Sequence, residues 1–414
     1  MSGQRFTLNG SDRLEAEIAD ILRRAGDVIC SRVGAGERRT LALIGGYGRG
    51  EGGVERRGAT ERIHNNLDLL LVLERPPRPG LQGELDAALE PLRARHEVGI
   101  DLGVVTARAL RRSPCLVMWY DARHGHRTVR GDPGFLPSLR HLTSEAILPD
   151  DVRDLLVNRG TLLVINDAVL ERGTPDEARR RALLRHAAKA IIGYGDALLF
   201  FRGGYHWSYA EKRRRMAAQP GVPEGFRRLY DEACAFRFEP DYERFASRGL
   251  ADWSGETRQR LAEVHLACEA ARLSAPGLRW EEHPGRTLRD ALAPGGLHPR
   301  LWLRKARNGL RFRPPSPEAL GHRERLGLRL GGPRGLLAAT FPVVAYGVGG
   351  APARDFARQV LGAASTGAAE LRRAYLRRWG DCGDANFKHV VGRLGLVLED
   401  GPAPAPPNVE ALSG

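Results

Sequence analysis

The chain has 414 residues, of which 42% are hydrophobic, so it can bury more than one core, and we expect two or three folded units. No stretch reaches the roughly 18 apolar residues of a membrane-spanning helix, and no secretory signal is evident, so we expect a cytoplasmic protein without a membrane partner. The net charge of +14 attracts anions in general, but the basic residues are spread along the whole chain, which argues against a dedicated nucleic-acid surface.

The first predicted element is an amphipathic helix over residues 12–33. Apolar residues recur along it at helical spacing, and Ser11 or Asp12 is suited to cap its N-terminus. A short apolar run at 41–44 then predicts a buried strand. We expect the helix to cover one face of a sheet that contains this strand.

A glycine-rich segment follows the strand and predicts a tight turn. Because glycine has no Cβ atom, the backbone amides of Gly45, Gly46 and Gly48 can approach a phosphate closely. Arg49 adds a planar positive charge beside them. The segment therefore suits a polyphosphate.

Two later apolar segments each carry an acid. In a strand predicted over residues 66–73, Asn66 and Asp68 share one face because strand side chains alternate. Asp101 lies inside a second apolar run, residues 98–105, where an ionised carboxylate is costly unless a cation meets it. A divalent metal held by oxygen atoms of these side chains would meet that charge.

The elements around these strands complete a first domain. The polar insert at 55–62 predicts a surface loop, and 81–96 predicts a helix between the two acidic strands. Residues 115–124 predict another helix, and 127–130 predict a last short strand. We therefore expect an α+β fold that begins with a small mixed-sheet domain over residues 1–145.

These motifs, in this order, resemble the DNA polymerase beta superfamily of nucleotidyltransferases. The closer similarity is to its small-substrate, aminoglycoside nucleotidyltransferase-like branch, and it covers residues 40–106. The resemblance implies that Asp68 and Asp101 are the second and third carboxylates of a magnesium site. It also implies that a nucleoside triphosphate, such as ATP, is bound by the loop residues Gly45, Gly46, Gly48, Arg49 and Gly50.

One position departs from the family pattern, because Asn66 stands where the first carboxylate is expected. The family implies two magnesium ions, and an amide oxygen can ligate a hard cation but adds no negative charge, so the second ion should be weakened most. Three explanations are open: an inactivated variant, a natural protein that binds nucleotide without efficient turnover, or an enzyme in which another acid supplies the charge. The candidate acids are Glu51, Glu55 and Glu61.

The segment from 146 to 280 predicts a helical bundle. Within it Asp196 lies among apolar residues, and the resemblance implies that it accepts a proton from the acceptor hydroxyl. The alternative is an ordinary helix-surface acid or one paired with Lys189. His206 and Lys212 are weaker candidates for phosphate contact.

Residues 281–400 predict a mostly helical C-terminal extension. Its role is open between an extension of the bundle, an acceptor-binding lid and a partner surface. The tail at 401–414 is rich in proline and alanine and predicts disorder.

Together these features predict a nucleotidyltransferase that moves a nucleoside monophosphate from a magnesium-bound nucleoside triphosphate to a hydroxyl group. The acceptor is expected to be a small molecule or a protein, since no recognised nucleic-acid module accompanies the domain. The alternative is a non-catalytic nucleotide-binding or antitoxin-like partner protein.

Overall fold

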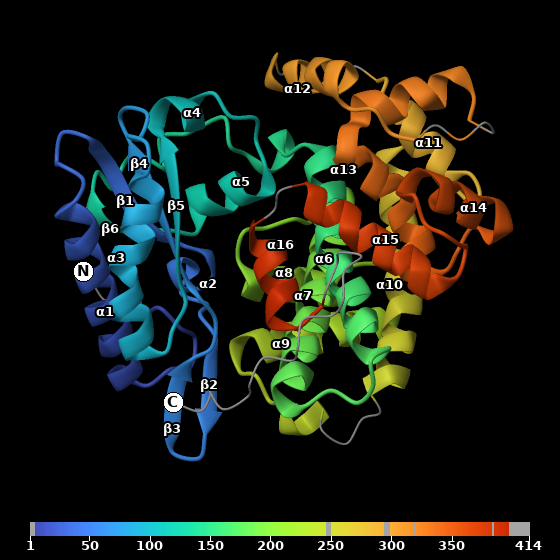
Figure 1. The fold of residues 1–414 in the computed structure, drawn as a ribbon. Helices are drawn as coiled ribbons and strands as arrows, with labels where there is room; N and C mark the ends of the chain where they lie inside the picture. The colour runs from blue at the N-terminus through green and yellow to red at the C-terminus, as the bar shows by residue number, and fades with distance from the viewer. Residues whose placement is uncertain are drawn as a thin grey trace. The chain divides into compact units, whose positions relative to one another are not determined.

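The computed structural model describes residues 5–245, 250–293, 299–315, 317, 320–382 and 385–396. The chain folds into two compact units, each built from two stretches of sequence (Figure 1). The sheet unit comprises Met1–Val152 and Arg202–Ser247, and the helical unit comprises Arg153–Phe201 and Arg248–Gly414. The predicted α+β class is confirmed, with a small mixed sheet in the first unit and a helical C-terminal part.

A four-stranded sheet forms the centre of the sheet unit, in the strand order β5-β4-β1-β6. Strands β4 and β5 run parallel, whereas β1 is antiparallel to both β4 and β6. Because parallel neighbours need a crossover connection, α3 (Leu81–His96) joins β4 to β5. The strands are β1 (Arg38–Ile44), β4 (Leu67–Leu73), β5 (Ile100–Thr106) and β6 (Arg127–Gly131).

One face of this sheet packs against α1 (Asp12–Cys30) and α3, as predicted for the first helix. Ser11 caps α1 with its side chain. Leu69 of β4 enters the same hydrophobic core as Leu85 of α3. Since neighbouring strand residues point to opposite faces, Asp68 projects away from these two helices.

Two segments differ from their predictions. The glycine-rich segment forms a short helix, α2 (Gly45–Arg49), whose first residue Gly45 has φ 68° and whose C-terminal cap, Gly50, has φ 81°. Both angles lie in the left-handed region that favours glycine. The insert predicted as a surface loop forms a hairpin of β2 (Val54–Arg57) and β3 (Thr60–Ile63), which the prediction missed because these charged strands lack an apolar alternation.

The extent of the first unit also differs from the sequence prediction, which ends it near residue 145 and places the following helices in one bundle. Residues 202–247 belong to the sheet unit. Arg56 of the hairpin donates to Glu239 at 2.6 Å, and local periodicity cannot encode such a distant contact. The remaining elements of this unit are α4 (Ala107–Arg111), α5 (Val117–His124), η1 (Ser144–Ala146), α8 (Tyr209–Ala217), α9 (Glu224–Phe238) and η2 (Glu243–Phe245).

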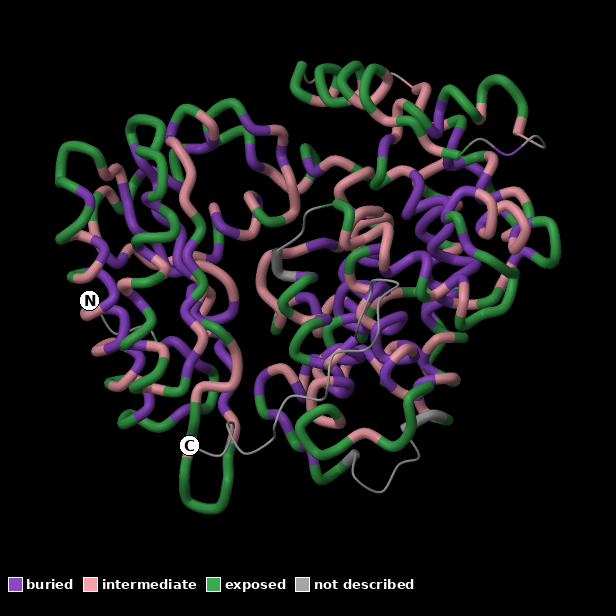
Figure 2. The backbone as a smooth tube through the Cα atoms, viewed as in Figure 1, coloured by how far each residue is buried: buried purple, intermediate pink, exposed green. Residues whose placement is uncertain are grey.

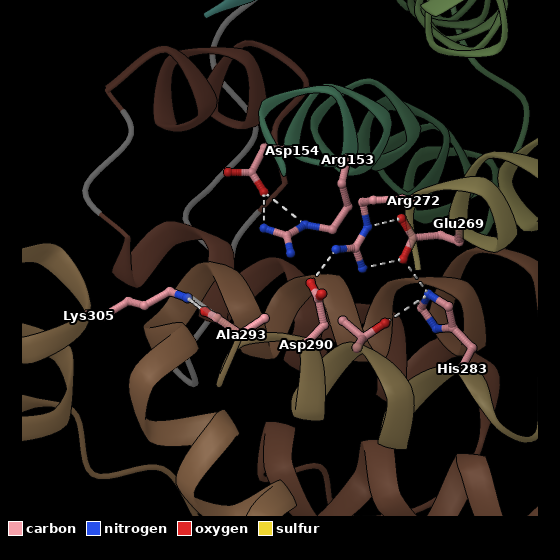
Figure 3. A network of polar contacts seen from close by, with 9 residues as sticks. Arg153, Asp154, Glu269, Arg272, His283, Asp290, Ala293 and Lys305 are labelled. Carbon is pink, nitrogen blue, oxygen red and sulfur yellow. Dashed lines mark hydrogen bonds and ion pairs between the residues drawn. The ribbon is translucent and has the colours of Figure 1, made fainter. Parts of the chain in front are cut away.

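The helical unit is organised around α13 (His322–Tyr346), whose second half is almost wholly buried. Gly332 interrupts its regular backbone with φ 66°. Figure 2 shows buried backbone gathered in the interior of this unit, and Figure 3 shows a network of polar contacts within it. The other helices are α6 (Pro149–Leu170), α7 (Glu177–Phe201), α10 (Leu250–Arg272), α11 (His283–Asp290), α12 (Pro299–Arg311), α14 (Gly350–Leu361), α15 (Ala368–Asp381) and α16 (Ala385–Arg393).

The described part of residues 281–400 is mostly helical, in agreement with the prediction. The tail predicted at 401–414 lies outside the described residues. Within the described chain, no helix combines the length and the apolar character needed to span a lipid bilayer.

Candidate functional site

Asp68 and Asp101 lie side by side on the parallel strands β4 and β5. The strand register pairs them directly, and paired residues of neighbouring strands project from the same face of a sheet, roughly 5 Å apart. Asp101 is exposed and Asp68 is partly buried. Two ionised carboxylates this close repel each other, so the arrangement favours a cation between them.

Asn66 completes this group from the position two residues before Asp68. Its amide nitrogen donates to Asp101 Oδ2 at 2.8 Å. Its amide oxygen faces Gly99, where an added methyl group would lie 2.3 Å from that oxygen. An ionised aspartate at this position could not donate the bond to Asp101, because a carboxylate only accepts.

The start of α2 approaches the same acids. A methyl group on Gly45 would lie 2.2 Å from Asp68 Oδ2, so glycine leaves the room that the carboxylate occupies. Gly48 instead serves packing, since a methyl group there would lie 2.5 Å from the carbonyl oxygen of Leu43. The glycine segment, Asp68 and Asp101 therefore meet at one end of the β4–β5 pair.

Arg49 is held in a buried ion pair at the other end of α2. Its guanidinium donates to Asp121 Oδ2 of α5 at 2.6 Å and lies 4.8 Å from the ring centroid of Tyr209. Burial by itself would lower the pKa of Arg49, but Asp121 and nearby tyrosines raise it above its usual value. Arg49 thus positions α2 against α5 and α8, and its predicted contact with a phosphate stays a prediction.

Arg237, in the last turn of α9, is a cation at this site that the sequence analysis missed. A methyl group on Gly46 would lie 2.9 Å from its terminal nitrogen, so the guanidinium adjoins the glycine segment. The guanidinium also lies 4.3 Å from the ring centroid of Tyr209, and its Nε is buried without a hydrogen-bond partner in the described chain. No local pattern marked this residue, because only the fold brings α9 to the glycine turn.

The acids considered as replacements for the charge missing at Asn66 are engaged elsewhere. Glu51 is buried and accepts a hydrogen bond at 2.5 Å from the hydroxyl of Ser208, the residue that caps the start of α8. Glu55 and Glu61 form ion pairs with arginines of the β2–β3 hairpin. The structure therefore does not favour an enzyme in which one of these glutamates restores the charge.

The donor set at the site fits one magnesium ion carried by a nucleotide. Magnesium is commonly bound through one or two carboxylates, while substrate phosphates and water supply its other ligands. Asp68 and Asp101 meet that requirement. Among the residues that the structure describes, no group of three or more His, Cys, Asp or Glu side chains could hold a metal ion.

Comparison with known proteins assigns no family. No protein-family model and no curated protein matches the chain. The interpretation of this site therefore depends on its residues and its geometry.

Three candidate residues remain: Asp196, Lys212 and His206. Asp196 is buried in α7 of the helical unit, and its role as a base stays a prediction. Lys212 is fully buried with its ammonium group 4.0 Å from the ring centroid of Tyr209. His206 accepts a hydrogen bond from the Ser208 amide at 3.1 Å, and burial lowers its pKa. Lys212 and His206 thus contribute to the structure around α8.

Proposed function

We propose that the sheet unit binds a magnesium-bound nucleoside triphosphate and transfers its nucleoside monophosphate to a hydroxyl group of a small molecule or a protein. The observation that carries this proposal is the direct pairing of Asp68 with Asp101 beside Gly45. Acids for a hard cation and backbone for a phosphate then converge on one place, as a bound metal triphosphate requires.

Each residue of the group has a role in this reaction. Asp68 and Asp101 would hold the ion, which when bound supplies neutralisation of charge on the phosphate oxygens. Gly45 and Gly46 would let the phosphates approach the backbone, and Arg237 would pair with a phosphate oxygen. The acceptor oxygen bonds to the α-phosphorus as the bond to pyrophosphate breaks, and the hydroxyl proton passes to Asp101.

One contact favours a second function, that of a nucleotide-binding partner protein without efficient turnover. Asn66 donates its amide to Asp101 and thereby engages one of the two carboxylate oxygens that could ligate a metal ion. A neutral donor at this position weakens a second ion most, and in a two-metal site that ion activates the attacking hydroxyl. The protein would then bind the triphosphate as a sensor or an antitoxin-like partner.

The substitution Asn66→Asp separates the two functions. If the protein is a transferase, restoring the acid should raise magnesium-dependent release of pyrophosphate by about tenfold or more. Asn65→Asp is the matched control, because it adds the same charge one residue earlier, where the side chain lies near Gly53. Transfer is followed with each of the four α-labelled triphosphates, offered with small-molecule and protein acceptor mixtures.

Three results are distinguishable. Labelled product that increases in Asn66→Asp, but not in Asn65→Asp, supports the transferase. Magnesium-dependent thermal stabilisation by a triphosphate, with no product from either variant, supports the binding function. Absence of stabilisation by every triphosphate, with and without magnesium, contradicts both functions.

A further inference from the structure

Helix α12 (Pro299–Arg311) packs on α13 through one narrow side and leaves the rest of its surface to solvent. None of its residues is buried, and Figure 2 draws most of this helix as exposed. The inner side is fixed by polar bonds: Lys305 Nζ donates to the Ala293 carbonyl at 2.6 Å (Figure 3), and Asn308 donates to the Leu330 carbonyl at 3.0 Å. A firmly attached helix therefore displays the residues on its outer side.

The outer side carries an apolar stripe. Trp302, Leu303 and Leu310 are 47%, 70% and 75% exposed. Helical geometry places residues three, four and seven positions apart on one side, so these three side chains and the exposed Ala306 form a continuous strip. Large apolar side chains left in water along one helix face mark a surface that is covered in use.

A basic stripe runs beside the apolar one. Arg304, Arg307 and Arg311 are exposed and recur at the same helical spacing. None of the three forms an ion pair with another described residue. No acidic residue occurs between positions 299 and 313, so the charge of the helix is uncompensated within its own sequence.

We propose that α12 docks this protein on the surface of an anionic lipid membrane. The helix would lie in the plane of the interface, with the apolar stripe among the acyl chains near the headgroups and the arginines on the lipid phosphates. At about 20 Å it is too short to cross a bilayer, so the contact is peripheral. This proposal departs from the expectation of a protein without a membrane partner and does not depend on the nucleotide site.

Charge complementarity selects this occupant over two others. A second copy of the chain, paired through the same face, would bring two uncompensated basic stripes together. The repulsion between these stripes would oppose the apolar contact. A nucleic acid would satisfy Arg304 and Arg307 but would leave Leu303 and Leu310 in water. An anionic membrane provides acyl chains for the apolar stripe and phosphates for the basic stripe at the same time.

The test measures co-sedimentation of the full chain with vesicles. We expect binding to vesicles of phosphatidylcholine mixed with phosphatidylglycerol, and weak binding to phosphatidylcholine alone. Arg304→Gln with Arg307→Gln should weaken binding by roughly 30-fold. The control, Arg214→Gln with Arg373→Gln, removes the same charge from exposed arginines on other helices and should retain binding.

The apolar stripe is tested by Trp302→Ser with Leu303→Ser, which should weaken binding by at least about tenfold. Leu8→Ser removes another exposed leucine, which lies in the sheet unit, and serves as its control. Unchanged melting temperatures show that the variants remain folded. Three results overturn the proposal: no binding of the wild type to anionic vesicles, binding that survives loss of the apolar stripe, or a dimer in solution that the same serine variant dissociates.

Discussion

The helical unit and the sheet unit each contain a cluster of charged side chains, and the clusters differ in which charges lie next to one another. In the helical unit, Glu269 is fully buried and accepts hydrogen bonds from Arg272 at 2.7 and 2.9 Å and from His283 at 3.0 Å (Figure 3). In the sheet unit, Asp101 is exposed and is paired in register with a second acid, Asp68. In the first cluster unlike charges are in contact, whereas in the second two like charges lie side by side.

This difference is the one expected between a structural cluster and the binding site that we propose. Burial alone would raise the pKa of Glu269, but Arg272 and His283 hold it well below its usual value, so the ion pair is complete without a ligand. Asp101 accepts a hydrogen bond from the neutral amide of Asn66 and lies in register with the like charge of Asp68. Their mutual repulsion is relieved by a bound cation, which is the property a metal-nucleotide site needs.

The largest loss of stability is expected when the charge of Glu269 is removed. Glu269→Gln leaves the buried Arg272 with Asp290 as its remaining acidic partner and should lower the free energy of unfolding by about 3 kcal/mol. Urea denaturation measures this loss. The control Glu370→Gln removes an acid from a partly exposed pair with Arg373 and should cost less than about 1 kcal/mol. Equal losses from both substitutions would contradict the structural role.

The reverse pattern is expected at the paired acids. Asp101→Asn should weaken magnesium-dependent triphosphate binding by about a hundredfold, since it removes a ligand charge, yet change the free energy of unfolding by less than about 1 kcal/mol. Isothermal titration and urea denaturation measure the two effects. Asp27→Asn, on the surface of α1, is the control for loss of one carboxylate. A large loss of stability in Asp101→Asn with intact binding would reverse the assignment.

The buried, neutral side chain of His186 in the helical unit makes the free energy of unfolding depend on pH. Burial lowers the pKa of His186 to about 3, from 6.5 in an ordinary setting. Between these values the unfolded chain binds more protons, so the free energy of unfolding falls as the pH is lowered, by up to about 1.4 kcal/mol per pH unit. His186→Gln should remove the contribution of this one proton and so lower the slope by up to about 1.4 kcal/mol per pH unit. Urea denaturation at a series of pH values between 6.5 and 4 measures the slope. An unchanged slope would show that His186 is not responsible.

The smallest expected effect concerns the support of α8. Glu51→Gln replaces a charged acceptor at the start of that helix by a neutral one and should lower the free energy of unfolding by about 1 kcal/mol. Glu55→Gln, in the exposed hairpin, is the control and should have a smaller effect. A gain of stability in Glu51→Gln would mean that the carboxylate is held there for another purpose.

Much of the local structure could be predicted. The helix expected at 81–96 occurs with those bounds, and Ser11 caps α1, because helical spacing and capping are encoded by residues close together in the chain. The alternation around Asp68 likewise determined which face of its strand carries the acid. The hairpin at 54–63 was missed because its charged residues carry no such signal.

By itself, the sequence determined the α+β class, the faces of the strands and the identity of the acids, since each depends on periodicity within one segment. The tertiary structure decided which segments lie together. Asp68 is in register with Asp101, Arg49 forms an ion pair with Asp121, and the guanidinium of Arg237 lies beside Gly46. These contacts join residues far apart in the chain, and they follow from packing of whole elements, which no local pattern records.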